Sequence, residues 1–307
     1  MARKRKRLVI HIGMHKTGST TIQRFLSRNR LVLRLAGVLY PASCGADGRR
    51  EPKHNALFTA ISHEADHGAP HPVLGPSADL VEAMAGRITS SRAQVAILSA
   101  EGFSGEKPAF SSALAPLGEY FDTRILVFLR RPDDWVESFY RQMILSREVR
   151  EARSLEAFLQ CPATRSHLDY CGILGWWAET FGREAVCALP YQADAGRDLA
   201  RAFLSAAGLP TALARLPHGG GHLNASAPRS AVEALWRENG GAGAFRTSLT
   251  PEERIELATR LLGEWSVSSN TVERAFSPPP FILSMLEKIL AENPDVQENA
   301  APFFGQN

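Results

Sequence analysis

Residues 8–21 read Leu-Val-Ile-His-Ile-Gly-Met-His-Lys-Thr-Gly-Ser-Thr-Thr, and this stretch decides the fold. Its first five residues form an apolar run that predicts a buried β-strand. A helical pattern follows from Ser19 to about Ala36, with Ile22, Phe25 and Leu26 on one face. A short glycine-containing loop separates the two. A strand, a tight loop and a helix in this order form the repeating unit of a parallel α/β sheet.

Further apolar runs predict three more strands. They lie at Gln94–Leu98, Arg124–Leu129 and Glu184–Leu189. A helix from about Asp133 to Ser146 follows the second of these runs, and Pro132 suits its first turn. Continuous apolar strands that alternate with helices indicate a parallel sheet covered on both faces.

The end of the chain is predicted to be helical, with candidates at Pro251–Leu262 and Phe281–Ala291. We therefore expect an α/β fold of the P-loop-like, three-layer α/β/α kind, with a central parallel sheet and a helical C-terminal part. A chain of 307 residues that is 44% hydrophobic can bury one large core. We expect residues 8–307 to form a single domain.

Charge gives little indication of a partner. The chain carries 35 Lys and Arg against 32 Asp and Glu, a net charge of +3. Nucleic-acid-binding proteins show a stronger basic stripe, so we expect no nucleic-acid partner. The one dense basic run, Arg3–Arg7, is interpreted as part of a solvated tail over residues 1–7.

Cysteines and hydropathy bear on the compartment. Cys44, Cys161, Cys171 and Cys187 form no CxxC pair and have no zinc-ligand spacing. They are typical of free thiols in a reducing compartment. No run of about 18 apolar residues occurs, so we expect no transmembrane segment. These features favour a cytoplasmic location.

The loop after the first predicted strand has the features of an anion site. N–H groups at the start of a helix have no partner within the helix, and the helix dipole favours negative charge there. Gly13 and Gly18 let the backbone wrap closely around a phosphate. Hydroxyl side chains at positions 17, 19, 20 and 21 add donors. The loop is therefore predicted to bind a phosphate-like group.

Comparison with the Walker pattern GxxxxGK[ST] indicates what kind of phosphate group the loop binds. Gly13 and Gly18 have the Walker spacing, and Thr20 occupies the Ser/Thr position. The Walker lysine position, however, is Ser19, and the lysine lies inside the loop as Lys16. This displacement argues against ATP or GTP hydrolysis. It places an ammonium group near a single 5′-phosphate and the bridging oxygen beyond it.

The run His11–Gln23 resembles the 5′-phosphosulfate loop of sulfotransferases that use 3′-phosphoadenosine 5′-phosphosulfate (PAPS). It is most similar to the bacterial carbohydrate-type branch, whose loop reads KTGTT. The serine at position 19 keeps the hydroxyl of that threonine. The resemblance implies that PAPS is the co-substrate and that its 5′-phosphosulfate contacts His15, Lys16, Thr17, Gly18, Ser19, Thr20 and Thr21.

A second segment, residues 125–140, is similar to the 3′-phosphate motif of the same family. That motif consists of an apolar strand, then Arg, Pro and Asp, then Ser and Tyr on the next helix. The resemblance implies that Arg130 and Ser138 bind the 3′-phosphate. An arginine offers a planar fork to phosphate oxygens, and a serine offers a hydroxyl donor. Arg131 is the alternative arginine.

Sulfuryl transfer needs a base for the acceptor and stabilisation of the leaving oxygen. Lys16 is the candidate for the second task. Glu101 and His54 are the two candidate bases, because Glu101 follows a predicted strand and His54 lies in a loop region that could face the acceptor. We expect no metal. The resemblance to the carbohydrate branch makes a hydroxyl or amine of a carbohydrate or glycoconjugate the expected acceptor.

Two other functions are compatible with these residues. One is a P-loop nucleotide kinase or other NTPase, which Ser19 at the Walker lysine position disfavours. The other is a nucleotide-binding protein without turnover. The chain also lacks the late Arg-Lys-Gly segment of the cytosolic sulfotransferases, and residues 219–226 are the candidate replacement.

Overall fold

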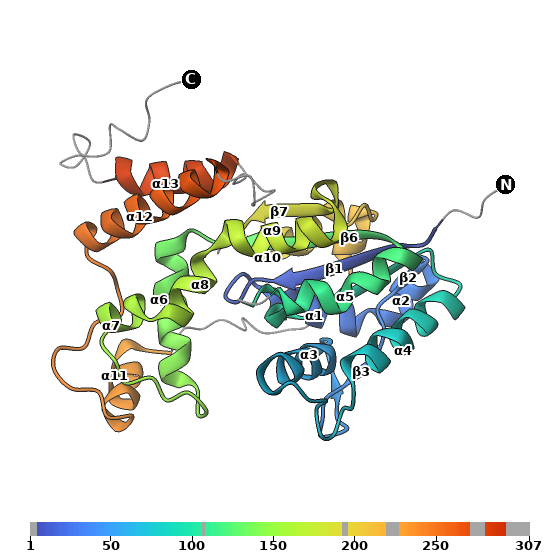
Figure 1. Cartoon of the computed structure of the whole chain (residues 1–307), viewed down its shortest axis with the longest axis horizontal. Helices are drawn as coiled ribbons and strands as arrows, with labels where there is room; N and C mark the ends of the chain where they lie inside the picture. The colour runs from blue at the N-terminus through green and yellow to red at the C-terminus, as the bar shows by residue number, and fades with distance from the viewer. Residues whose placement is uncertain (1–4, 106–107, 192–195, 219–226, 271–279, 293–307) are drawn as a thin grey trace. The chain divides into compact units, whose positions relative to one another are not determined.

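The computed structural model describes residues 5–105, 108–191, 196–218, 227–270 and 280–292. The chain forms two compact units, which are described separately (Figure 1). Unit 1 comprises Met1–Leu129 and Ile173–Gly221, and unit 2 comprises Arg130–Gly172 and His222–Asn307. The expectation that residues 8–307 form a single domain stays a prediction.

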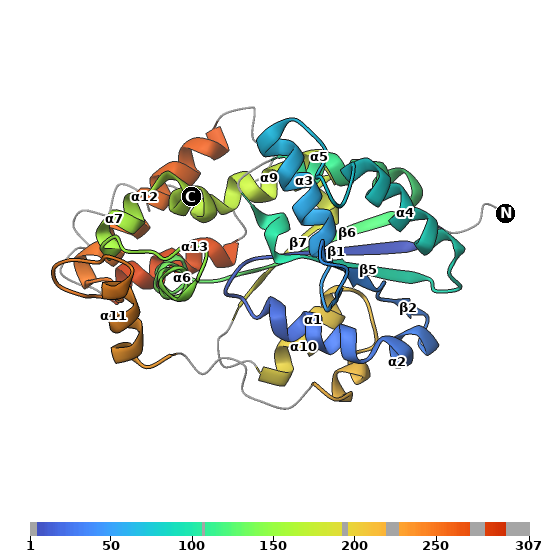
Figure 2. The ribbon, with the colours of Figure 1, turned by 90° about the horizontal axis from the view of Figure 1, so that it is seen from below.

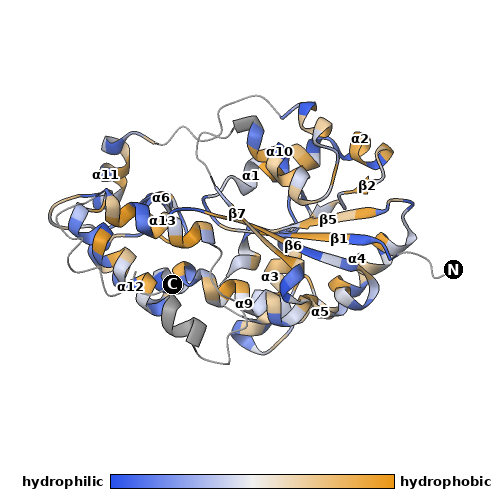
Figure 3. Ribbon diagram, turned by 90° about the horizontal axis from the view of Figure 1, so that it is seen from above, coloured by the Kyte–Doolittle hydropathy of each residue, from blue (hydrophilic) through white to orange (hydrophobic). Residues whose placement is uncertain are grey.

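Unit 1 is built on a five-stranded parallel sheet of order β2-β5-β1-β6-β7. Its strands are β2 (Val38–Leu39), β5 (Val95–Ser99), β1 (Arg7–Gly13), β6 (Asp122–Leu129) and β7 (Val186–Pro190). All four predicted strands are therefore present, and the short strand β2 adds a fifth strand at one edge of the sheet. The central strands are mostly hydrophobic along their length (Figure 3). This confirms the predicted α/β class with a central parallel sheet.

Helices cover both faces of this sheet, as continuous apolar strands require (Figure 2). One face carries α1 (Ser19–Arg28), α2 (Arg30–Leu35) and α10 (Gly196–Ala206). The other face carries α3 (Asn55–His67), α4 (Ser77–Ser90) and α5 (Ala109–Tyr120). Unit 1 is thus a three-layer α/β/α sandwich.

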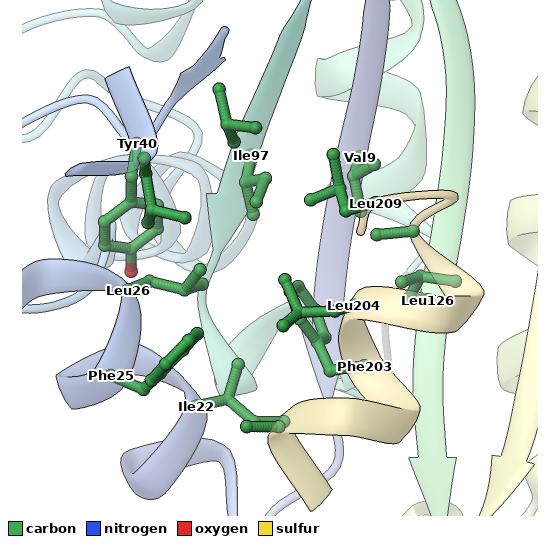
Figure 4. Close-up of a cluster of buried hydrophobic side chains, with 14 of the residues drawn as sticks. Val9, Ile22, Phe25, Leu26, Tyr40, Ile97, Leu126, Phe203, Leu204 and Leu209 are labelled. Carbon is green, nitrogen blue, oxygen red and sulfur yellow. The ribbon is translucent and has the colours of Figure 1, made fainter. Parts of the chain in front are cut away.

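The core between α1, α10 and the sheet contains the apolar face predicted for the first helix. Ile22, Phe25 and Leu26 are fully buried and pack with Phe203 and Leu204 of α10 (Figure 4). Full burial of each such side chain contributes roughly 1.5–3 kcal/mol to stability. This packing fixes the direction in which α1 leaves the loop at its amino end.

The predicted helix from Ser19 to about Ala36 is interrupted. Two helices, α1 and α2, occupy this range, and Asn29 lies between them. The Asn29 side-chain amide donates to the carbonyls of Phe25 at 2.8 Å and Pro217 at 2.9 Å. An asparagine that bonds to nearby backbone competes with the helix, which accounts for the break.

Arg5, Lys6 and Arg7 are not part of a solvated tail. Lys6 Nζ donates to three carbonyl oxygens at the end of α4, at 2.5, 2.8 and 2.9 Å. Arg5 donates to two carbonyls in the last turn of α5, and Arg7 Nη1 donates at 3.4 Å to the carbonyl of Ala207, just after α10. Cations at helix carboxyl ends complement the orphan carbonyls and the dipole. Residues 1–4 lie outside the described residues.

The described residues of unit 2 form helices and connecting loops without a strand. The helices wholly within unit 2 are α6 (Pro132–Leu145), α7 (Leu155–Gln160), α8 (Pro162–Leu168), α11 (Arg229–Glu238), α12 (Pro251–Asn270) and α13 (Pro280–Ala291). The predicted helices after Pro132, Pro251 and Pro280 are therefore confirmed, with α12 extending beyond its predicted end. Within the described ranges, no helix is both long and apolar enough to cross a membrane.

Candidate functional site

The loop between β1 and α1 has left-handed backbone at three positions. Gly13, Lys16 and Gly18 have φ angles of 116°, 63° and 76°. A Cβ atom on Gly13 would lie 2.8 Å from the carbonyl oxygen of Glu101, and one on Gly18 would lie 2.4 Å from Leu199 Cδ2. Both glycines are therefore needed for backbone geometry and for space. The loop is held between the start of the 3₁₀ helix η1 (Glu101–Ser104) and α10.

Lys16 is the non-glycine residue among these three. Left-handed backbone at a residue with a side chain costs of order 1–3 kcal/mol and persists only where the surroundings enforce it. Such residues cluster at sites that bind or react. The Lys16 side chain is half-buried in the loop. The strain at this position thus favours a functional role for the lysine over a solvated surface position.

Two of the predicted hydroxyl donors close the loop on itself. Thr17 Oγ1 and Ser19 Oγ donate to the carbonyl oxygen of Met14 at 2.7 and 3.0 Å, and both side chains are buried. A hydroxyl has one proton to donate, so neither group has a donor left for an anion in this arrangement. Thr20 is exposed and Thr21 is half-buried, so their hydroxyls are accessible.

Backbone amides supply the remaining donors. The N–H groups of Thr21 and Ile22 donate to the Gly18 carbonyl at 2.9 and 3.3 Å, which makes Gly18 the N-cap of α1. In the first turn of α1, the N–H groups that precede Thr21 have no helical carbonyl one turn earlier to which they could donate. With the positive end of the helix dipole, these N–H groups favour binding of an anion. We call residues 13–18 the anion loop. The first turn of α1 contains no acidic residue that could compete with an anion for these N–H groups.

Glu101 lies where the sequence predicts it, at the carboxyl edge of the sheet directly after β5. Its Oε1 atom is 3.2 Å from Lys53 Nζ, and the carboxylate side chain is 21% exposed. Its backbone carbonyl lies against Gly13 of the anion loop. A partly exposed carboxylate beside this loop can take a proton from an acceptor.

His54, the other candidate base, is completely buried. Its ring Nδ1 accepts a hydrogen bond from the Ser99 backbone N–H at 3.0 Å, and the His54 backbone N–H donates to the Ser99 carbonyl at 2.8 Å. Burial lowers the pKa of His54 to about 4, so the ring is neutral near pH 7. The neutral ring then carries its proton on Nε2 and has no lone pair left for an acceptor proton. This arrangement favours Glu101 as the base.

A buried polar cluster behind the loop was missed by sequence reasoning. Ser99 Oγ lies 2.8 Å from His11 Nδ1 and 3.2 Å from Gln23 Nε2, and all three side chains are buried. Burial lowers the pKa of His11 to about 4. The cluster ties β1, β5 and α1 together immediately behind the anion loop. The available signal was a histidine within an otherwise apolar strand.

Arg130 follows β6 directly and is the first residue of unit 2. Its carbonyl accepts a hydrogen bond from the buried Tyr170 hydroxyl at 2.9 Å. The neighbouring Arg131 forms a bidentate ion pair with Asp133, with Nε–Oδ1 and Nη2–Oδ2 distances of 2.8 Å. Arg131 is therefore engaged inside unit 2. This pairing counts against Arg131 as the phosphate ligand.

Ser138 lies on α6, two turns after Arg131, and its side chain is half-buried. Arg130 and Ser138 both belong to unit 2, whereas the anion loop and Glu101 belong to unit 1. The residues predicted for each phosphate therefore lie within a single unit. Residues 219–226, the candidate replacement for the late Arg-Lys-Gly segment, lie outside the described residues.

In the part of the chain that the structure describes, no group of three or more His, Cys, Asp or Glu side chains is arranged to hold a metal ion. No protein-family model matches the chain, and no curated protein matches it.

Among the solved structures that resemble this chain are two sulfotransferases. A sulfotransferase from Alicyclobacillus acidocaldarius is 18% identical, with a TM-score of 0.49, over 90% of this chain and 98% of that one. A sulfotransferase domain from the curacin biosynthetic pathway is 10% identical, with a TM-score of 0.40, over 95% of this chain and 98% of that one. At these values neither likeness supports a family or an activity, so the functional proposal depends on the residues described above.

Proposed function

We propose that the protein is a sulfotransferase that moves a sulfuryl group from PAPS to a hydroxyl or amine of an acceptor. The observation that carries this proposal is Lys16, held in left-handed backbone inside a loop that opens onto the amino end of α1. A lysine at this place meets a single 5′-phosphate and the oxygen beyond it. The resemblance of residues 11–23 to the phosphosulfate loop identifies that group as a phosphosulfate.

The chemistry is an in-line displacement at sulfur. The acceptor oxygen or nitrogen forms a bond to sulfur while the bond from sulfur to the bridging phosphate oxygen breaks. Glu101 takes the proton that the acceptor loses. The Lys16 ammonium stabilises the negative charge that grows on the departing oxygen. The amides at the start of α1 bind the 5′-phosphate in both substrate and product.

The 3′-phosphate of the donor binds Arg130 and Ser138 in this proposal. The resemblance of residues 125–140 to the 3′-phosphate motif supports the choice of Arg130. The pairing of Arg131 with the buried Asp133 carboxylate counts against the alternative arginine. A charge-assisted hydrogen bond to this phosphate distinguishes PAPS from nucleotides that lack it.

The acceptor proposed is a carbohydrate or glycoconjugate, on the resemblance of the loop to the carbohydrate-type branch. The proposed location is the cytoplasm, since the free thiols Cys44, Cys161, Cys171 and Cys187 suit a reducing compartment. No step of the proposed reaction uses a metal ion.

Calorimetric titration tests the donor. Adenosine 3′,5′-bisphosphate, AMP and ATP–Mg²⁺ are titrated into the same preparation. We expect the bisphosphate to bind at least tenfold more tightly than AMP, because of its 3′-phosphate contact. Equal affinities for the bisphosphate and AMP would remove the basis for PAPS. Tightest binding of ATP–Mg²⁺ would instead favour an NTPase.

A further inference from the structure

The first turn of α6 contains a buried carboxylate that two arginines share. The side chain of Asp133 is fully buried. Arg131 pairs with it from the preceding turn, and Arg254 pairs with it from α12. Burial alone would raise the pKa of the Asp133 carboxyl, but the hydrogen bonds and charges of the two arginines hold that pKa below its ordinary value. Asp133 is therefore charged, and both arginines compensate it.

Arg254 also contacts a second acidic residue of α6. Its guanidinium pairs with Glu137, one turn after Asp133, and Glu137 Oε1 accepts a hydrogen bond from the Leu249 N–H at 3.0 Å. Arg254 thus bridges two successive turns of α6 from one position on α12. Ser138 is the residue immediately after Glu137 on this helix.

Further contacts hold Arg130 and the residue that follows it. On its carboxyl side, Arg131 is held by Asp133, and Arg131 Nη1 also donates to Glu292 Oε1 at 2.9 Å. At Arg130 itself, the carbonyl is held by the Tyr170 hydroxyl at 2.9 Å. The Arg130 carbonyl and the Arg131 side chain are therefore bonded to three different parts of unit 2.

We infer that Arg254 is a positioning residue for the 3′-phosphate of the donor. Acting through Asp133 and Glu137, it holds the start of α6 so that Arg130 and Ser138 keep the separation and direction that one phosphate needs. This inference rests on the proposed function, in which those two residues bind that phosphate. The helical C-terminal part lies outside both sequence motifs, and this inference gives it a role in binding the donor.

Preorganisation explains why such a residue affects affinity without contacting the ligand. A phosphate gains most from two donors that are already in place, because ordering them during binding costs free energy. Removing Arg254 leaves Asp133 paired with Arg131, so the turn still forms. The turn is then no longer tied to α12, and binding the 3′-phosphate must order it. AMP has no 3′-phosphate, so its affinity does not depend on this ordering.

The test compares Arg254→Met with the matched control Arg246→Met. Arg246 lies just before α12 and also forms two ion pairs, but these are with Glu253 and Glu156 among the described residues. We expect Arg254→Met to weaken adenosine 3′,5′-bisphosphate binding about tenfold and to leave AMP binding unchanged. Arg246→Met should change neither affinity. Circular dichroism and thermal unfolding establish that each variant is folded.

A double-mutant cycle shows whether Arg254 acts through Arg130. If it does, Arg254→Met has no further effect on bisphosphate affinity in an Arg130→Ala background. If Arg254→Met lowers bisphosphate affinity by the same factor with and without Arg130→Ala, the inference is wrong. Should Arg254→Met fail to fold, Arg254→Lys provides the same test, because an ammonium keeps the charge but loses the planar fork that bridges two carboxylates. It should weaken bisphosphate binding and leave AMP binding unchanged.

Failure of the inference and failure of the proposed function give different results. If the unmodified protein binds the bisphosphate and AMP equally, the proposed function is wrong. If the unmodified protein prefers the bisphosphate and Arg254→Met keeps that preference, only the positioning role of Arg254 is wrong.

Discussion

Lys53 Nζ lies 3.2 Å from Glu101 Oε1, at the carboxyl edge of the sheet and beside the anion loop. The pair is partly exposed, so the carboxylate is accessible to an acceptor. As the proposed general base, Glu101 should contribute a factor of roughly 10²–10⁴ to the rate. We expect Glu101→Gln to lower kcat by at least a hundredfold while bisphosphate affinity changes little. Single-turnover kinetics on an identified acceptor measure this.

His54 provides the comparison for Glu101. Because its ring is buried and bonded to Ser99, His54→Gln should lower stability and leave kcat within several-fold of normal. A variant pair in which His54→Gln abolishes turnover and Glu101→Gln retains it would assign the base to His54.

Lys16 should act mainly on turnover. The bridging oxygen gains negative charge only as its bond to sulfur breaks, so the ammonium interacts more strongly with the transition state than with the ground state. Lys16→Met is expected to lower kcat on the order of a hundredfold or more. Bisphosphate affinity should fall less, because the amides at the start of α1 remain. Lys16→Arg should restore little, since a guanidinium is wider than the ammonium that the loop holds.

Near-normal turnover in Lys16→Met would assign the stabilisation of the leaving oxygen to another group. Affinity for the bisphosphate, measured on the same preparation, separates this result from a loss of donor binding.

Substitutions of the two neighbouring arginines should affect different properties, ligand affinity for Arg130 and stability for Arg131. Arg130→Ala is expected to weaken bisphosphate binding by roughly 1.5–3 kcal/mol, the range for a hydrogen bond to a charged group. Arg131→Ala removes one partner of the buried Asp133 carboxylate and should mainly lower the free energy of unfolding. Calorimetry and urea unfolding on both variants measure the two effects. Arg131 is the phosphate ligand if only its substitution reduces bisphosphate affinity.

Stability should fall in mild acid because two histidines are buried as neutral rings. Burial lowers the pKa of His11 and His54 from 6.5 to about 4. As pH falls, these two histidines therefore bind protons at a higher pH in the unfolded chain than in the folded protein. The stabilisation is fully present above pH 6.5 and is lost as pH falls towards 4, by up to roughly 1.4 kcal/mol per pH unit for each ring. Urea unfolding between pH 7.5 and 4.5 measures this slope.

Replacing His54 with Gln removes one titrating ring, so that variant should show a shallower decline over the same pH range. An equal slope in the variant and the unmodified protein would attribute the acid sensitivity to carboxylates instead.

Lys6 should stabilise unit 1 although it lies in a basic run near the end of the chain. Its ammonium group donates to three carbonyl oxygens at the end of α4. We expect Lys6→Met to lower the free energy of unfolding by roughly 1–2 kcal/mol, from lost charge-assisted bonds and dipole stabilisation. Arg49→Met is the control, because Arg49 is 87% exposed and its pair with Asp47 at 3.6 Å contributes little. Equal effects of both changes on urea unfolding would contradict the capping role.

Local pattern alone determined the layers of unit 1 and the place of its anion loop. Apolar runs such as Leu8–Ile12 and Arg124–Leu129 are long enough to identify buried strands, because burial on both faces leaves a continuous apolar sequence. The spacing of Gly13 and Gly18 and the displaced Lys16 likewise lie within one short segment. Hydrophobic burial and backbone geometry act through near neighbours, so the sequence contains this information directly.

Only the tertiary structure decided what each polar side chain does. Lys6 bonds to Ile88, 82 residues away, and Arg254 pairs with Asp133, 121 residues away. The partners show that Lys6 caps a helix and that Arg131 is tied to the buried Asp133. The burial of His54 is likewise set by packing against Ser99, 45 residues away. A polar group acts through the donor or acceptor opposite it, and folding alone brings these distant partners together.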